Sequence, residues 1–160
     1  MFAFKDVEGR AWNLDLTIGD VKRVRSLTGV DLLDAREGKI LSELANDPCV
    51  TVDILYAIVK PEADSRGMTD EQFGQSLDGD SLRQAVDALV AALIDFFLRF
   101  QPPVGHVLKA LWGKIESAAE RGGELVRQRM EGPEVDAMIE RELVKATRAI
   151  DRALGMESMS

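Results

Sequence analysis

The chain has 160 residues and a mass of 17.6 kDa, which fits one domain, or one domain with a helical extension. A hydrophobic content of 46% is enough for a core and argues against disorder. The formal net charge of −8 disfavours broad affinity for nucleic acid or anionic membranes, because phosphate groups select clustered Lys and Arg. The single cysteine, Cys49, can form no internal disulfide and suits a reducing compartment.

The sequence favours a cytoplasmic protein. Its first residues show no basic segment followed by an apolar one, so we expect no cleaved secretion signal. The most apolar stretch, residues 84–100, is interrupted by Asp87, Asp95 and Arg99. The uninterrupted apolar run is therefore far shorter than the roughly 20 residues that a membrane-spanning helix needs.

The N-terminal residues predict a β-hairpin. Apolar and polar residues alternate over residues 2–5 and 12–16, and Glu8-Gly9 lies between the two runs. Two strands alone are marginally stable in water, so their apolar face must pack on helices. That face carries Phe2, Phe4, Trp12 and Leu14.

A first helix is expected to begin after Thr17, which forms a capping box with Asp20, and to stop at Gly29. Its predicted apolar stripe consists of Ile18, Val21, Val24 and Leu27. A second helix is expected over residues 39–45.

Three further helices complete the predicted body. Asp47-Pro48 is a cap followed by a first-turn proline, and we expect Pro61 to end the helix that it opens. Thr69 to Gln72 form a second capping box before a short helix around Phe73. A turn over residues 76–81 then leads to a helix capped at Asp80 or Ser81. This helix has the strongest apolar periodicity in the sequence, and we predict that it forms the core. Its apolar face consists of Leu82, Val86, Leu89, Leu93 and Phe97. Four neighbouring apolar residues widen this face: Ala85, Val90, Ile94 and Phe100.

Beyond Pro102-Pro103 the pattern predicts long amphipathic helices. Apolar periodicity runs over residues 107–130, and we expect Gly122-Gly123 to kink or split this helix. Gly132-Pro133 marks another break before a last amphipathic helix over residues 135–154.

The predicted fold is therefore mainly α: an N-terminal β-hairpin packed on a helical bundle over residues 1–100, followed by a C-terminal helical arm over residues 101–160. Residues 31–100 hold 6 basic and 14 acidic residues and so account for the whole net charge of −8. The arm mixes both signs, which is typical of a solvated helix with an apolar stripe.

No residue pattern predicts catalysis, a metal site or a cofactor. His106 and Cys49 are each alone in the sequence, whereas zinc needs converging ligands. Asp78-Gly79-Asp80 lacks the further oxygen ligands of a calcium loop and is explained by a turn before a helix. No glycine-rich phosphate loop and no nucleophile motif are present. We expect a binding protein, not an enzyme.

The basic run Lys22, Arg23 and Arg25 has two interpretations. It could be the contact helix of a small DNA-binding regulator, or the solvated face of the first helix. Three charges without interleaved aromatic residues in an acidic chain favour the solvated face.

A series of short segments within residues 1–100 carries a resemblance to a known family. The segments are Phe2 to Asp6, Gly9 to Trp12, Leu14 to Gly19, Val21 to Val24, Thr28 to Leu33, Asp53 to Tyr56, Phe73-Gly74, Leu77 to Asp80, and Ala88-Leu89 through Asp95 to Phe97. Through them, residues 1–100 resemble the tail assembly chaperone group of long-tailed phages and prophages. The resemblance implies a protein that coats and solubilises the tape measure protein, helps recruit tail tube subunits and leaves before the tail is complete. It also implies that a longer product arises by ribosomal frameshifting, and it brings no catalytic residues.

The arm is the predicted client-binding surface, because amphipathic helices can cover the apolar stripes of an extended helical client. The candidate residues are Leu111, Trp112, Ile115, Leu125, Val126, Met138, Ile139 and Leu143. The alternative is that these stripes pack on each other or on the body. Two other functions stay open: a structural tail or connector component and the DNA-binding regulator. The oligomeric state, a homo-oligomer included, is open as well.

Overall fold

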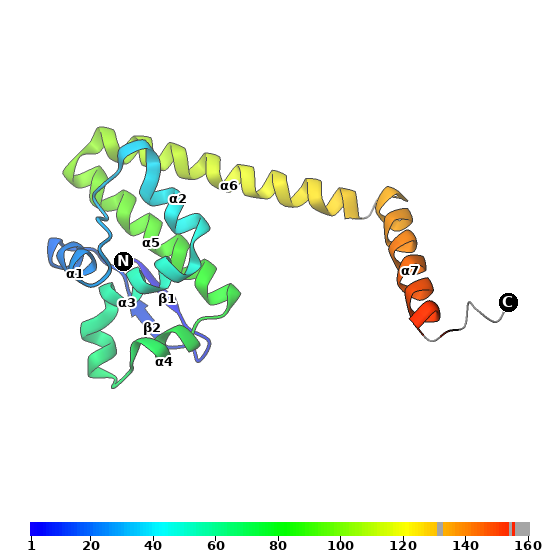
Figure 1. Ribbon diagram of the computed structural model, residues 1–160. Helices are drawn as coiled ribbons and strands as arrows, with labels where there is room; N and C mark the ends of the chain where they lie inside the picture. Colours follow the sequence, from blue (N-terminus) through cyan, green and yellow to red (C-terminus); the bar gives the residue numbers. More distant parts are fainter. Residues whose placement is uncertain (131–132, 154, 156–160) are drawn as a thin grey trace. The chain divides into compact units, whose positions relative to one another are not determined.

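The computed structural model describes the backbone of residues 1–130, 133–153 and 155, and the side chains of residues 1–128, 137–153 and 155. The described chain is mainly helical and begins with a two-stranded antiparallel hairpin, which confirms the predicted fold class (Figure 1). Its elements are β1 (Ala3–Lys5), β2 (Ala11–Asn13), α1 (Ile18–Thr28), the 3₁₀ turn η1 (Arg36–Gly38), α2 (Lys39–Asn46), α3 (Pro48–Ser65), α4 (Asp70–Gln75), α5 (Gly79–Phe100), α6 (Pro102–Met130) and α7 (Pro133–Ala153).

The hairpin is closed by one buried carboxylate, that of Asp6. β1 pairs with β2 so that Phe4 lies opposite Trp12, and both side chains are buried. The Asp6 carboxylate accepts hydrogen bonds from Arg10 Nε at 2.7 Å and from Trp12 Nε1 at 3.1 Å. It also accepts the backbone N–H groups of Glu8 and Arg10. Burial alone would raise the pKa of this carboxyl, but the four donors together outweigh burial and hold the pKa below its ordinary value.

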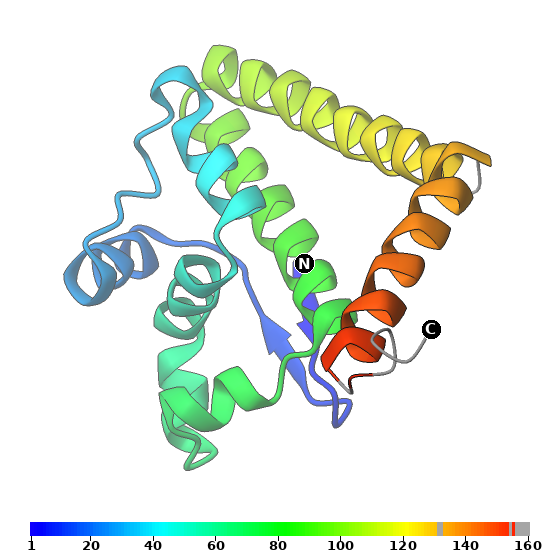
Figure 2. The ribbon, with the colours of Figure 1, turned by 45° about the vertical axis from the view of Figure 1, so that its right-hand side comes forward.

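An aromatic cluster joins the hairpin to the helices. The Phe73 ring of α4 lies edge-on to Phe4 and Trp12, with centroid distances of 6.5 and 5.3 Å, and it is tilted against Tyr56 of α3 at 5.7 Å. The Arg66 guanidinium stacks over the Trp12 ring. The hairpin lies between α5, which contacts β1, and α3, which contacts β2 (Figure 2).

Helix α5 forms the centre of the core, as predicted, but with a rotated buried face. Its N-cap is Asp78, not Asp80 or Ser81, because the Asp78 carboxylate accepts the Ser81 N–H. The buried apolar side chains are those of Ala85, Leu89, Val90, Ala92, Leu93, Ile94 and Phe97. Phe100 is exposed, and Leu82 and Val86 are partly exposed, whereas Ala92, which was not in the predicted stripe, is buried.

Helix α1 begins with the predicted capping box of Thr17 and Asp20 and ends at Gly29. Its predicted apolar stripe is too wide, because only Val21 and Val24 are buried. Ile18 and Leu27, at the two ends of the helix, are about half exposed.

Helix α3 does not stop at Pro61, as we expected, but continues to Ser65. Proline has no N–H for the carbonyl four residues earlier, which is that of Ala57. The guanidinium of Arg23 donates to this carbonyl at 3.1 Å and to that of Ile58 at 3.1 Å. A side chain of α1 therefore satisfies the backbone acceptor that Pro61 leaves free, and the helix can pass through the proline.

The corner between α5 and α6 depends on a close backbone approach. A Cβ atom on Gly105 would lie 2.6 Å from the backbone nitrogen of Leu98, so any side chain there would force the helices apart. The first turns of α6 bury Leu108, and the chain forms one compact unit over Met1–Gly113 and another over Lys114–Ser160. Sequence alone put the boundary at residue 100.

Helix α6 runs without interruption through Gly122-Gly123, so the expected split at these glycines is wrong. Glycine lowers helix propensity by about 1 kcal/mol relative to alanine, and the good helix formers on both sides outweigh this cost. Gly132, at the expected break before Pro133, and Leu154, at the expected end of the last helix, lie outside the described residues.

We predict that Arg23→Ala lowers the free energy of unfolding by about 1–3 kcal/mol, because it leaves the Ala57 carbonyl without a donor. The loss should shrink in a Pro61→Ala background, where residue 61 supplies the N–H itself. Urea titrations of the four chains in this double-mutant cycle measure the coupling. The exposed neighbour Lys22→Ala is the control, and equal losses for Arg23→Ala in both backgrounds would contradict the assignment.

We predict that Asp6 makes the stability depend on acid pH. Its folded pKa is lowered, so its contribution is complete above the ordinary value of 3.8 and is lost as the pH falls through the folded value. Asp6→Asn should therefore be less stable than the parent at pH 6, and the difference should shrink at pH 3. Urea midpoints of both chains at the two pH values test this, and a constant difference would contradict it.

Candidate functional site

The eight predicted client-binding residues fall into two groups. Leu111, Trp112 and Ile115, in the first half of α6, are half-buried. The other five, Leu125, Val126, Met138, Ile139 and Leu143, are each more than half exposed.

Leu111 packs on the body and is not a free surface. A Cβ atom on Gly38 would lie 3.1 Å from Leu111 Cδ1, and Gly38 itself has a φ of +67°, which disfavours any side chain. Leu108, one turn earlier, is 1% exposed. At this end of α6, the alternative that the apolar stripe covers its own body holds.

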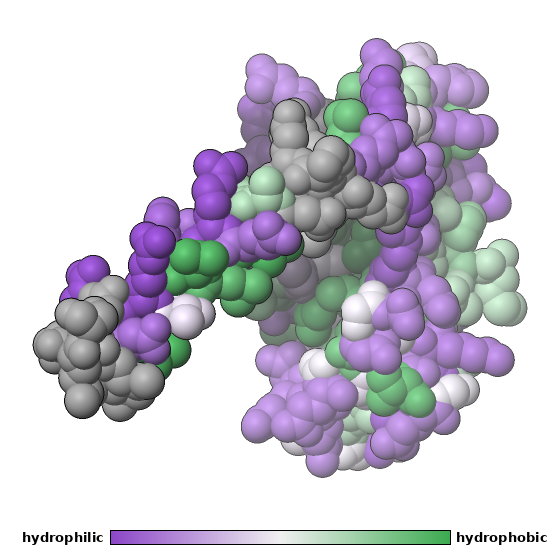
Figure 3. All heavy atoms as spheres, turned by 90° about the vertical axis from the view of Figure 1, so that its right-hand side faces the viewer, coloured by the Kyte–Doolittle hydropathy of each residue, from purple (hydrophilic) through white to green (hydrophobic). Residues whose placement is uncertain are grey.

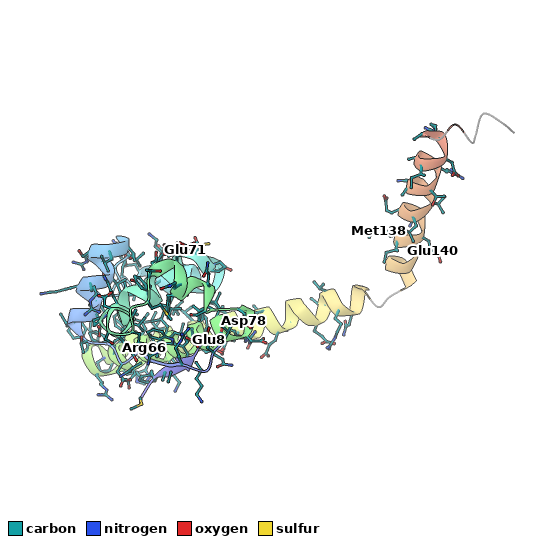
Figure 4. The ribbon with its side chains drawn as sticks, turned by 90° about the horizontal axis from the view of Figure 1, so that it is seen from below. Glu8, Arg66, Glu71, Asp78, Met138 and Glu140 are labelled. Atoms are coloured by element: carbon teal, nitrogen blue, oxygen red, sulfur yellow. The ribbon has the colours of Figure 1, made fainter. Side chains whose placement is uncertain are left out.

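The apolar side chains of α7 gather on one side of the helix. Met138, Ile139 and Leu143 share this side with Ile150, and all four are more than half exposed. In Figure 3 the apolar side chains of this helix line one side and the polar ones the other. Met138 and Glu140, labelled in Figure 4, lie two positions apart, about 200° around the helix. The rest of the helix surface bears charges of both signs. Glu142 lies at the edge of the apolar side, about 40° from Met138, and forms an ion pair with Lys145 at 3.4 Å.

Three exposed apolar residues in the described part of the arm are not among the eight candidates. Ile150 is 59% exposed on the apolar side of α7, and Val107 is 58% exposed in the first turns of α6. Val144 is half exposed on another side of α7, about 100° or more around the helix from the four stripe residues. The apolar periodicity over residues 107–130 includes Val107 together with the buried Leu108, so only the packed structure reveals which of the two is exposed.

Among the hollows on the surface of the first unit are two that segments distant in sequence form together. One, of about 500 Å³, lies between the N-terminal residues and the end of α5 and is lined by Phe2, Leu16, Phe96 and Phe100. The other, of about 670 Å³, lies between the 31–36 loop and the start of α6, with Val104 and Val107 among its lining residues. Sequence reasoning missed both hollows, because each is formed by segments distant in sequence.

The basic run on α1 is largely occupied within the chain. Arg23 forms an ion pair with Asp20 at 3.1 Å besides its bonds to the α3 carbonyls. Arg25 pairs with Asp31 at 3.1 Å. Lys22 alone of the three has no ion pair in the described structure, which weakens the interpretation of this run as a nucleic-acid contact.

The remaining candidate groups have local structural roles or stand apart. Backbone and side-chain hydrogen bonds from Ser81 hold the pKa of Asp78 below its usual value, as befits an N-cap carboxylate. Cys49 and His106 are both exposed. Among the described residues, no three His, Cys, Asp or Glu side chains converge in a way that could hold a metal ion.

None of the described helices combines the length and the apolar character needed to cross a membrane.

Comparison of the chain with protein-family models, with curated proteins and with solved structures gives no match.

We predict that the apolar side of α7 contributes little to folding. Leu143→Ser should change the free energy of unfolding by less than about 0.5 kcal/mol, since the side chain is 61% exposed. Leu93→Ala, in the core of α5, should cost about 2–5 kcal/mol. Urea unfolding of both variants measures the contrast, and a large loss for Leu143→Ser would show that this side packs within the chain.

Proposed function

We propose that this chain is a tail assembly chaperone of a long-tailed phage or prophage, which binds and solubilises the tape measure protein and helps recruit tail tube subunits. The resemblance of residues 1–100 motivates the proposal. The structural observation that supports it is the stripe of exposed apolar side chains on α7, together with Leu125 and Val126 on α6.

Such a stripe suits a helical client. Scattered exposed apolar residues are normal on protein surfaces, but a row at helical spacing is the pattern by which one amphipathic helix packs against another. A tape measure protein is a long helical chain whose apolar stripes need cover until the tail tube encloses them. Each leucine or isoleucine fully buried by the complex would contribute about 1.5–3 kcal/mol before the costs of association.

The charge distribution fits temporary binding. The polar side of α7 carries Glu140, Arg141 and Lys145, so a coated client would present mixed charges to water instead of apolar surface. A contact made mostly of aliphatic side chains on one or two helices is small, and small interfaces can be exchanged for others during assembly. A chaperone that leaves before the tail is complete needs this property.

We predict that co-expression with the long helix-rich product of a neighbouring gene raises the soluble yield of that product several-fold. Ile139→Ser with Leu143→Ser should abolish most of the gain, because both side chains lie on the apolar side of α7. Arg141→Ser with Lys145→Ser, on the polar side of the same helix, should retain it and is the matched control. Soluble and pelleted client are quantified after lysis.

Two results would contradict this function. One is a client yield that does not respond to co-expression. The other is recovery of the chain in stoichiometric amounts from purified particles, which is expected of a structural tail or connector component and not of a chaperone that departs.

A further inference from the structure

We propose that the apolar side of α7 binds a partner helix whose own apolar row is flanked on both sides by Lys or Arg. Such a helix would be the segment of the client that contacts α7, so the proposal rests on the proposed function. The partner is identified by the way in which α7 sorts its charged side chains around the helix.

Four residues of α7 form a row with the spacing of a coiled coil. Ile139, Leu143, Ala146 and Ile150 follow one another at intervals of four, three and four positions. This alternation keeps the row on one side of a helix that winds around another helix. The side chains of Ile139, Leu143 and Ile150 are each more than half exposed, so the row is open to a partner. Met138 lies outside the row, about 80° from Ala146.

Acidic side chains flank the row on both sides. Because successive residues of a helix are about 100° apart, Glu142 lies about 40° outside Ala146. Glu140 lies about 60° outside Leu143, on the opposite side of the row, and Asp151 lies about 80° outside Leu143 on the same side as Glu140. Glu140 and Glu142 are both exposed. The two edges of the surface that a partner would contact are therefore negatively charged.

The basic side chains of α7 point away from this row. They are Arg141, Lys145, Arg148 and Arg152, and each lies at least about 100° outside the row. The described side chains of α7 include four basic and three acidic residues, so the acidic edges reflect placement and not composition. Lys145 contacts Glu142 at 3.4 Å, but both side chains are more than two-thirds exposed, and an ion pair so exposed is weak. Glu142 is therefore available to a cation of the partner.

These acidic edges define the chemistry of the partner helix. When two helices pack along apolar rows, the residues that flank one row face those that flank the other, and opposite charges favour the pairing while like charges oppose it. Because Glu142 and Glu140 occupy both edges, a partner with cations on both edges matches α7 whichever way the two helices run. Flanking charges of this kind decide which partner binds, while the apolar row supplies the affinity.

An anionic membrane is a poorer match for the same surface. Helices that lie in a membrane surface carry Lys and Arg beside the apolar side, where the cations reach lipid phosphates. Helix α7 has Glu140 and Glu142 in these places and holds its basic residues further around the helix. The charge pattern therefore favours a protein helix over a lipid surface.

The α6 helix of this chain, or of a second copy, matches only one of the two acidic edges. Cations flank the apolar row of α6 on one side only: the row is Ile115, Ala118, Gly122 and Leu125, with Lys114 and Arg121 on one flank and Ala119 and Val126 on the other. If α6 packed on α7 in either direction, one of the two glutamates would face Ala119 or Val126 in place of a cation. A helix with cations on both flanks is the better partner.

Two synthetic amphipathic peptides with the same row of leucines test the charge preference. One carries Lys and the other Glu at the positions that flank the row, and the full chain is titrated into each while the fluorescence anisotropy of the labelled peptide is recorded. We expect the Lys peptide to bind about tenfold more tightly at low salt, and the ratio of the two affinities to fall as salt is added. Equal affinities would overturn the proposal, and so would binding of neither peptide.

Charge-reversal variants separate the edges of α7 from the overall negative charge of the chain. Glu140→Lys with Glu142→Lys should reduce the ratio of the two affinities at least several-fold. Asp53→Lys with Asp87→Lys changes the net charge by the same amount at exposed positions of α3 and α5, and should leave the ratio close to that of the parent. Equal ratios in the two double variants would contradict the proposal, because the whole chain and not α7 would then select the peptide.

Removal of the apolar row tests the other occupants. Ile139→Ser with Leu143→Ser should abolish binding of the Lys peptide, and retained binding would place the peptide elsewhere and refute the proposal. Without peptide, sedimentation equilibrium and flotation with phosphatidylglycerol vesicles should show neither dimers nor vesicle binding that this double variant removes. A dimer that it dissociates would make a second copy the occupant, and vesicle binding that it abolishes would make a membrane the occupant.

The proposed function and this charge preference can fail separately. Equal affinities for the two peptides, with a client that co-expression does solubilise, would contradict the charge preference alone. A client that stays insoluble, with a preference for the Lys peptide that depends on Glu140 and Glu142, would contradict the chaperone function and leave the partner chemistry of α7 in place.

Discussion

The packing of the hairpin against Phe73 is the interaction on which the body depends. A two-stranded sheet cannot hold itself together in water, and here the rings of Phe4 and Trp12 meet the Phe73 edge while Tyr56 closes the cluster from α3. Helix α4 is short and is secured by its capping box and by this one ring. The cluster thereby ties strands and helices that are distant in sequence into a single core.

Buried polar groups complete this core without leaving an acceptor unpaired. The Asp6 carboxylate closes the hairpin turn and accepts the indole N–H of Trp12, so the same residue fixes the turn and the ring that packs on Phe73. Arg23 plays a comparable part on the other side of α3, where it supplies the donor that Pro61 lacks. No buried side-chain nitrogen or oxygen among the described residues lacks a hydrogen-bond partner, which is the condition for a uniquely packed interior.

The two units differ in how far their large apolar side chains are buried. In the first unit the large apolar side chains of α3 and α5 are mostly buried, while α7 keeps its own exposed. A single helix of 21 residues is marginally stable in water, and ion pairs one turn apart add only about 0.2–0.5 kcal/mol each. Packing against another helix would stabilise α7 further. The proposed client contact would supply that packing.

The sequence by itself determined the elements whose signals are local. Thr17 with Asp20, Thr69 with Gln72, and Asp47-Pro48 start helices where expected, because a cap acts on backbone groups within three residues. The alternation around Phe4 and Trp12 likewise sufficed for the hairpin, and the amphipathic spacing identified the exposed stripe on α7. Only the tertiary structure decided that α3 continues through Pro61, that Phe100 is exposed and that Leu111 packs on the body. For Pro61 and Leu111 the deciding partners are Arg23 and Gly38, which lie more than thirty residues away along the chain, where no local pattern can indicate them.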